Sequence, residues 1–224
     1  MRSLLAFAFC VSAVAAPYAS NRHIQVRLDE HTGALTVTDL RSHHEWVQKP
    51  VGSWSVAGSR VDASEIRLTL HDAANNLDLT AQVALSKDKP EMEVTLSGSG
   101  PLKSNVGFPF PFVTGKGTGL VVPMNEGILY PVDDAGINNR RLVAYGGHGI
   151  CIPWFGATDL QSGESYMAIL ETPDDAQIDI TRQRLRFVHP SAMGCFAGTV
   201  FLRSQDSLRV LRSRRLCGAG QALP

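Results

Sequence analysis

Alternation of apolar and polar residues with a period of two dominates the first half of the chain. It places Ile24, Val26 and Leu28 on one face of one segment, and it recurs at 34–38, 66–71, 77–83 and 92–96. Turn-forming residues cluster between these segments, at Asp29–Gly33, Asp72–Asn76 and Ser86–Pro90. Successive side chains of a strand point to opposite faces, so each segment predicts a half-buried β-strand followed by a turn.

A repeating unit of strand and turn, about ten residues long, is typical of sandwiches and barrels. No window before residue 200 keeps the apolar spacing of an amphipathic helix for three turns. We therefore expect an all-β chain, an antiparallel β-sandwich that extends from about residue 21 to 202.

Residues 1–15 have the pattern of a signal peptide. Arg2 precedes an apolar run from Leu4 to Val14, and Ala13-Val14-Ala15 gives a small-x-small cleavage site. The run is too short to span a bilayer as a helix. We expect export to the periplasm or the extracellular space, with no transmembrane segment in the mature chain.

Export makes disulfides possible, and three cysteines follow residue 15. Cys151–Cys195 is the favoured pair, with Cys217 left over. No closely spaced Cys/His set suggests zinc, so no metal site is expected.

The formal net charge is zero, so the composition gives no reason to expect a nucleic-acid partner. The chain also lacks a G-x-S-x-G elbow, an HExxH pair, a phosphate loop and a dinucleotide fingerprint, so no cofactor and no catalytic residue is assigned.

Two segments interrupt the alternation. Gly107–Phe112 alternates Phe with Pro, and Pro lacks the donor that a central strand needs. This segment is either an aromatic platform for a ligand or a cover over the open end of the sandwich, and the second interpretation is favoured. The Arg-rich segment 203–224 is read as a short helix or a disordered tail, in preference to a basic face for nucleic acid.

The stretch from Tyr145 to Ala176 reads mainly as a β-meander, with a buried strand at 152–155, a turn at 159–164 and a strand at 165–171. Polar and aromatic side chains nevertheless gather at the predicted strand ends. If their loops share one rim, they form a candidate site for a carbohydrate or for contact with another domain. Taken alone, each acid is more often a turn residue. The candidate rim residues are Glu126, His148, Trp154, Glu171, Asp174 and Asp175.

Several short runs, in order along residues 23 to 200, resemble one known domain type. They are Leu35–Asp39 with Trp46, Gly107–Phe110, Leu120–Pro123, Glu126–Leu129, Pro153–Gly156 and Tyr166–Ala176. The chain resembles the N-terminal β-sandwich of bacterial glycoside hydrolases related to families 101 and 129, the endo-α-N-acetylgalactosaminidase-like group. That sandwich is similar to galactose mutarotase.

In such enzymes a (β/α)₈ barrel that carries the catalytic carboxylates follows the sandwich, and a barrel needs about 250 residues of its own. The 224 residues here leave no room for one. The resemblance therefore implies a non-catalytic module or a truncated fragment of a secreted glycoside hydrolase-like protein. Its partner would be a carbohydrate or the missing catalytic barrel.

Two alternatives stay open at this point. One is an aldose 1-epimerase-like mutarotase, for which His148 and Glu171 would be the acid and base. The other is a free-standing carbohydrate-binding module that stacks Trp154 and the Phe rings of 107–112 on sugars. We also expect an exposed apolar patch that joins Phe108–Phe112 to the loops around Glu126 and His148, with self-association as its consequence.

Overall fold

The computed structural model describes residues 16–124, 127–134, 140–143, 152–171, 177–181, 184–188 and 196–204. Within these ranges the β-strand is the only regular secondary structure, and every pair of neighbouring strands is antiparallel. The strands lie in a small, a large and a three-stranded sheet. No helix in this part of the chain is long and apolar enough to cross a membrane.

Within each of the three sheets, neighbouring strands lie in the order given below. The small sheet consists of β1 (Tyr18–Ser20), β2 (Ile24–Leu28), β3 (Leu35–Asp39) and β4 (Glu45–Val47). The large sheet consists of β10 (Ile128–Pro131), β9 (Thr118–Val122), β12 (Trp154–Asp159), β13 (Ser165–Leu170), β16 (Phe196–Ser204), β8 (Glu91–Gly98), β7 (Leu77–Leu85), β6 (Glu65–Asp72) and β5 (Trp54–Val61). The three-stranded sheet consists of β11 (Arg140–Val143), β14 (Gln177–Thr181) and β15 (Arg184–Val188).

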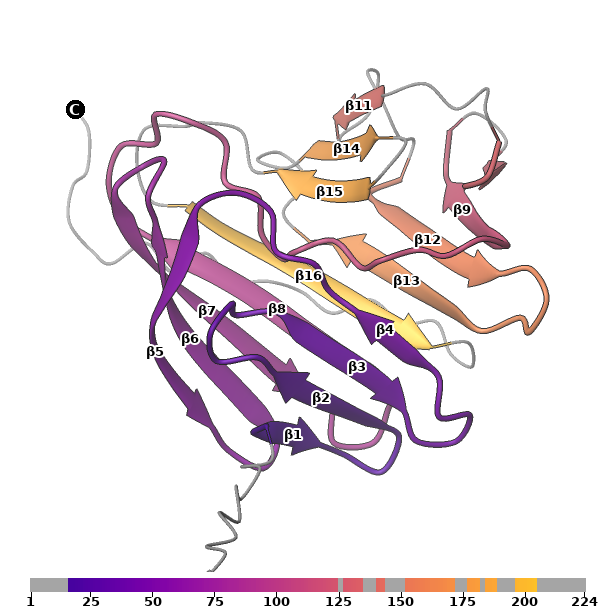
Figure 1. Cartoon of the computed structure of the whole chain (residues 1–224), viewed down its shortest axis with the longest axis horizontal. Helices are drawn as coiled ribbons and strands as arrows, with labels where there is room; N and C mark the ends of the chain where they lie inside the picture. The colour runs from indigo at the N-terminus through magenta and orange to yellow at the C-terminus, as the bar shows by residue number, and fades with distance from the viewer. Residues whose placement is uncertain are drawn as a thin grey trace, which may run out of the picture.

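The small sheet lies across one face of the large sheet, and the two enclose the core (Figure 1). Alternate residues supply that core, as the period-two pattern predicts. Ile24, Val26 and Leu28 of β2 are at most 2% exposed, and the inward residues of β6 and β8 are equally buried. The predicted all-β antiparallel sandwich is therefore confirmed.

Some boundaries differ from the sequence-based expectation. The first strand, β1, begins at Tyr18, and β16 continues to Ser204. The buried strand expected at 152–155 is wrong in its bounds, because Ile152 is exposed and β12 runs from Trp154 to Asp159. The proposed signal peptide, the tail beyond Ser204 and all three later cysteines lie outside the described residues.

Four hairpin turns share one construction. Each begins with an aspartate whose Oδ1 accepts the main-chain N–H two residues later at 2.8–3.0 Å, and these are Asp29, Asp39, Asp72 and Asp159. Four residues after each aspartate the backbone has a positive φ, at Gly33, His43, Asn76 and Gly163. The side-chain acceptor replaces a main-chain partner, so the sequence forms a tight turn between antiparallel strands.

The Gly107–Phe112 segment closes one side of the sandwich. Its main chain bonds to β4 and the residues after it, through Lys49 N to Pro111 O at 2.9 Å and Val113 N to Val47 O at 2.8 Å. Phe108, Phe110 and Phe112 are 0%, 1% and 8% exposed. The favoured covering interpretation is confirmed, and the alternative of an aromatic platform is wrong. The exposed apolar patch that we expected is wrong for these Phe rings, while Glu126 and His148, whose loops were to complete it, lie outside the described residues. The segment runs between the two sheets, so its rings pack into the core.

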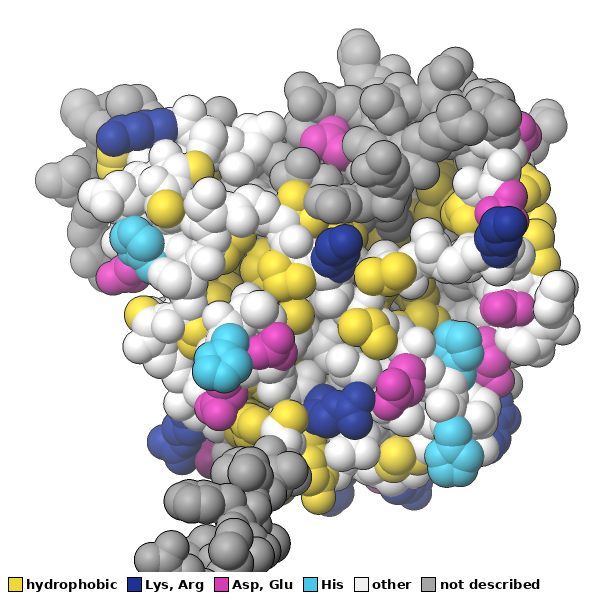
Figure 2. All heavy atoms as spheres, viewed as in Figure 1, with side chains coloured by type: hydrophobic (Ala, Val, Ile, Leu, Met, Phe, Trp, Pro, Cys, Tyr) yellow, Lys and Arg dark blue, Asp and Glu magenta, His cyan; other side chains and the backbone are white. Residues whose placement is uncertain are grey.

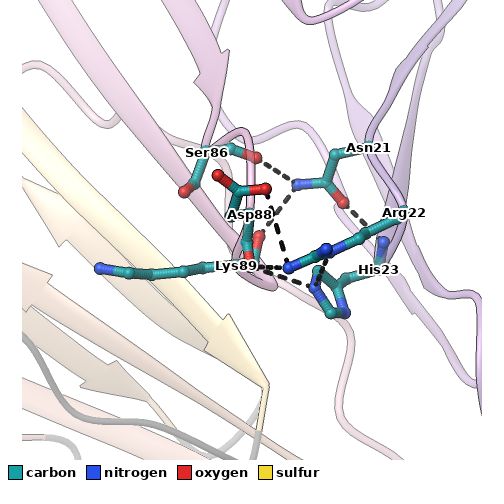
Figure 3. A network of polar contacts seen from close by, with 6 residues as sticks. All are labelled: Asn21, Arg22, His23, Ser86, Asp88 and Lys89. Atoms are coloured by element: carbon teal, nitrogen blue, oxygen red, sulfur yellow. Dashed lines mark hydrogen bonds and ion pairs between the residues drawn. The ribbon is translucent and has the colours of Figure 1, made fainter.

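The side chain of Asn21 ties a loop of the small sheet to a turn of the large sheet. The Nδ2 atom of Asn21, between β1 and β2, donates to Ser86 O at 2.6 Å and to Lys89 O at 2.9 Å in the β7–β8 turn (Figure 3). Its Oδ1 accepts the N–H groups of His23 and Ile24. One side chain thereby fixes the β1–β2 loop against the opposite sheet.

Candidate functional site

The structure describes two of the six predicted rim residues, Trp154 and Glu171. Trp154 opens β12 and pairs with Ile169 of β13, while Glu171 directly follows β13. Leu170 N donates to Pro153 O at 2.8 Å, which closes this end of the hairpin. Trp154 and Glu171 therefore lie at the same end of the β12–β13 hairpin, and both are partly exposed.

Trp154 points away from the core. Phe155 and Ala157 are buried between the sheets, so Trp154 and Gly156 face the outer side of the large sheet. A Cβ atom built on Gly156 would lie 3.9 Å from Cζ3 of Trp154 and 2.9 Å from Tyr166 O. The indole thus lies over a glycine that leaves room for it, and an indole held this way can stack on a sugar ring.

The other predicted rim residues, Glu126, His148, Asp174 and Asp175, lie outside the described residues, as does the pair Cys151–Cys195. Their convergence with Trp154 and Glu171 stays a prediction. The two described members define only one end of one hairpin.

The aspartates that open the hairpin turns accept hydrogen bonds from main-chain N–H groups of the same turn. Hydrogen bonds from the main-chain N–H groups of Ser162 and Gln161 lower the pKa of Asp159 below its usual value. For Asp29, burial raises the pKa, but hydrogen bonds from Thr32 and His31 outweigh this effect and lower it. Both carboxylates are ionised hydrogen-bond acceptors at neutral pH, a state that suits turns rather than proton transfer.

A pocket of about 240 Å³ lies at the opposite end of the β12–β13 hairpin, between that hairpin and β4. We call it the β4–hairpin pocket. Residues from three distant parts of the sequence line it, including His44, Trp46, Lys116, Asp159, Glu164 and Tyr166. A larger hollow of about 390 Å³ borders the β2–β3 hairpin beside Ala16 and Pro17.

Aromatic rings form the apolar wall of the β4–hairpin pocket. The rings of His44 and Trp46 lie 4.7 Å apart between centroids, and Trp46 meets Tyr166 edge-on at 6.3 Å. Burial raises the pKa of the Tyr166 phenol, which keeps it neutral at physiological pH. No sequence pattern predicts this pocket, because the residues that line it come from segments far apart in the chain.

Carboxylates outnumber cations in the pocket. Glu45 is paired with Arg27 at 3.1 Å, and Asp159 is held by its turn. Glu164 and Lys116 form no ion pair with any other residue that the structure describes. Over the face of the molecule seen in Figure 2, by contrast, basic and acidic side chains are interspersed.

The sheets, their order and the shared core define a galactose mutarotase-like β-sandwich. No protein-family model and no curated protein matches the sequence. Among solved structures, the chain is similar to the alpha-N-acetylgalactosaminidase NagBb from Bifidobacterium bifidum, with a TM-score of 0.68 at 13% identity. That match covers 84% of this chain and 36% of NagBb, so this chain spans little more than a third of the enzyme's length.

Two further structures show how widely this fold occurs. A galactose mutarotase related enzyme from Lactobacillus acidophilus gives a TM-score of 0.53 at 9% identity, over 86% of this chain and 98% of that one. A TPR-domain containing protein from Parabacteroides distasonis gives 0.55 at 10% identity, over 88% and 49%. Identities this low show a common fold alone.

Proposed function

We propose that this chain is a non-catalytic β-sandwich module of an exported, glycoside hydrolase-like protein involved in carbohydrate processing. The observation that carries the proposal is the match to NagBb, in which most of this chain corresponds to a minor part of a larger glycosidase. A carbohydrate, or a separate catalytic barrel, is the proposed partner.

The roles of the described carboxylates support the proposal. Hydrolysis of a glycosidic bond requires two carboxyl groups about 5–10 Å apart across the bond. The four aspartates Asp29, Asp39, Asp72 and Asp159 each open a hairpin and bond to its backbone. Glu171 directly follows β13, at the same end of the hairpin as Trp154, and one of its carboxylate oxygens is buried.

An assay of the purified full chain on p-nitrophenyl α-N-acetylgalactosaminide and p-nitrophenyl α-galactoside tests the proposal. We expect no turnover above that of a mock purification. Turnover that disappears in Glu171→Gln or Glu126→Gln, both prepared in parallel, would show a catalytic carboxylate and overturn the proposal.

A second candidate function is mutarotation of an aldose. The match to the Lactobacillus acidophilus enzyme favours it, because that match covers nearly the whole of a chain named as mutarotase-related. Glu171 would then take the proton of the anomeric hydroxyl as base, while His148 as acid protonates the ring oxygen, so that the ring opens and can close to the other anomer. Polarimetry of fresh α-galactose and α-glucose decides the matter: acceleration that is lost in Glu171→Gln supports a mutarotase, and an unchanged rate excludes it.

A further inference from the structure

The β4–hairpin pocket is separate from the predicted rim. Trp154 and Asp159 stand at opposite ends of β12, which at about 3.3 Å per residue places them roughly 17 Å apart. Trp154 also faces the outer side of the sheet, whereas Ala157 and Tyr166 face the core and line the pocket. A ligand in the pocket would therefore leave Trp154 and Glu171 untouched.

We propose that the β4–hairpin pocket binds a single monosaccharide ring, neutral or positively charged in preference to anionic. The choice of sugars as ligand class rests on the proposed function, while the size and charge preference come from the pocket itself. The occupant would be the end residue of a glycan or a free sugar.

The size of the pocket sets the size of the ligand. Its volume of about 240 Å³ lies below the range of about 300–1,000 Å³ for drug-sized ligands. One pyranose ring suits such a volume, and a longer glycan would have to extend past Gly115 into solvent. Gly115 is exposed, and a Cβ atom there would meet nothing within 4 Å.

The wall of the pocket combines the two surfaces that a sugar requires. The partly exposed ring of His44, backed by the largely buried rings of Trp46 and Tyr166, offers an apolar surface to the C–H face of a pyranose. Glu164 supplies acceptors and Lys116 donors for hydroxyl groups. Neither is engaged in an ion pair within the described part of the chain.

The charges at the pocket determine which sugars it favours. Glu45, Asp159 and Glu164 line the pocket together with one lysine, Lys116, and Arg27 outside the pocket pairs with Glu45. An added carboxylate or phosphate would be repelled, whereas an amino sugar would pair with Glu164. This preference is the opposite of what a basic, phosphate-binding pocket would show.

The chain's three tryptophans allow the site to be located directly. Trp46 lines the pocket, Trp54 packs on Phe108 and Phe110, and Trp154 reports on the outer face. The full chain would be labelled with 5-fluorotryptophan, and each ¹⁹F signal assigned by a single Trp→Phe variant. Galactose, galactosamine and galacturonate would then be titrated separately.

We expect galactose and galactosamine to shift the Trp46 signal with a Kd of about 1 mM, typical of so small a ligand. Galacturonate should bind at least about tenfold more weakly, and Glu164→Gln should weaken galactosamine about fivefold while sparing galactose. Gly115→Phe should block the pocket and abolish the shift. The matched control is Gly58→Phe, in the far edge strand β5, where an added Cβ also meets nothing within 4 Å.

Three outcomes would overturn the proposal. They are the absence of any Trp46 shift, a shift that survives Gly115→Phe, and a shift at Trp154 alone. The last would place sugar binding at the rim, and it would leave the proposed function standing without the pocket. The glycosidase assay reports on the proposed function independently, since none of these substitutions touches Glu126 or Glu171.

Discussion

His43 occupies a backbone position that the other hairpins give to Gly or Asn. Its φ is 61°, four residues after Asp39, and its side chain is exposed. A left-handed conformation costs a residue with a Cβ about 1–2 kcal/mol, and glycine avoids this cost while losing some chain entropy.

We predict that His43→Gly raises the free energy of unfolding by about 0.5–1 kcal/mol in urea titrations. Gly163→Ala, at the corresponding position of the β12–β13 turn with φ 77°, should lower it by about 1 kcal/mol. Equal stability of His43→Gly and wild type would show that the imidazole makes a compensating contact.

The turn aspartates also predict an acid dependence of stability. The pKa values of Asp29 and Asp159 are lowered from 3.8 in the folded chain. A lowered folded pKa stabilises the native state above the unfolded pKa, and this contribution is lost as pH falls through the folded pKa.

Stability should therefore fall between about pH 4 and pH 2. The double variant Asp29→Asn/Asp159→Asn retains an oxygen acceptor in each turn but cannot titrate. In urea titrations at each pH, its stability should fall less steeply over this window than that of wild type. If the stability of the variant and that of the wild type fall equally steeply with pH, the acid dependence does not come from these two turns.

At the scale of elements, local pattern predicted the strands that alternate most regularly. β2, β3, β6, β7 and β8 each expose one face to solvent, so their sequences alternate and their inward residues could be named. The placement of β16 between β13 and β8 could not be predicted, because it depends on pairing between β16 and β8, which lie about a hundred residues apart in the sequence. The β4–hairpin pocket escaped prediction for the same reason: three distant segments build it.

The Gly107–Phe112 segment shows a different limit of sequence reasoning. Alternating Pro and Phe excludes a central strand, but it does not say which way the rings point. Hydrogen bonds to Val47 and Lys49 fix the segment beside β4 and direct its rings inward. A ring such as Phe108, which contacts Phe110 at 5.4 Å between centroids, then belongs to the core.

We therefore predict that Phe108→Ala lowers the free energy of unfolding by about 3–5 kcal/mol, because it leaves a cavity between the sheets. Val113→Ala, one residue past the segment and 58% exposed, is the matched control and should change stability by less than about 0.5 kcal/mol. Urea denaturation followed by circular dichroism measures both. A loss below about 1 kcal/mol for Phe108→Ala would mean that this segment contributes little to the core.

At the scale of the whole molecule, the two sheets share one core. Residues of the small sheet such as Val26 and Leu35 belong to the same buried cluster as Leu68 and Val94 of the large sheet. Neither sheet can expose its inner face without exposing that of the other. Since burial of apolar surface dominates the stability of a domain of this size, the sheets should unfold together.

Asn21 provides the test of that coupling, because its side chain connects the two sheets through two hydrogen bonds to the β7–β8 turn (Figure 3). Two further hydrogen bonds hold the same side chain to its own loop. We predict that Asn21→Ala lowers the free energy of unfolding by about 1–3 kcal/mol, since Ser86 O and Lys89 O lose their side-chain donor. Arg22→Ala should have an effect below about 0.5 kcal/mol, because Arg22 is 65% exposed and its ion pair with Asp88 spans 3.7 Å.

Two probes then show whether the sheets still unfold together in Asn21→Ala. Fluorescence of Trp46, in a Trp54→Phe/Trp154→Phe background, should report the small sheet, while far-UV circular dichroism reports all strands. Both transitions should shift together to the same lower urea midpoint. An earlier midpoint for Trp46 would show that the small sheet separates first, and that the side chain of Asn21, rather than the shared core, couples the two sheets.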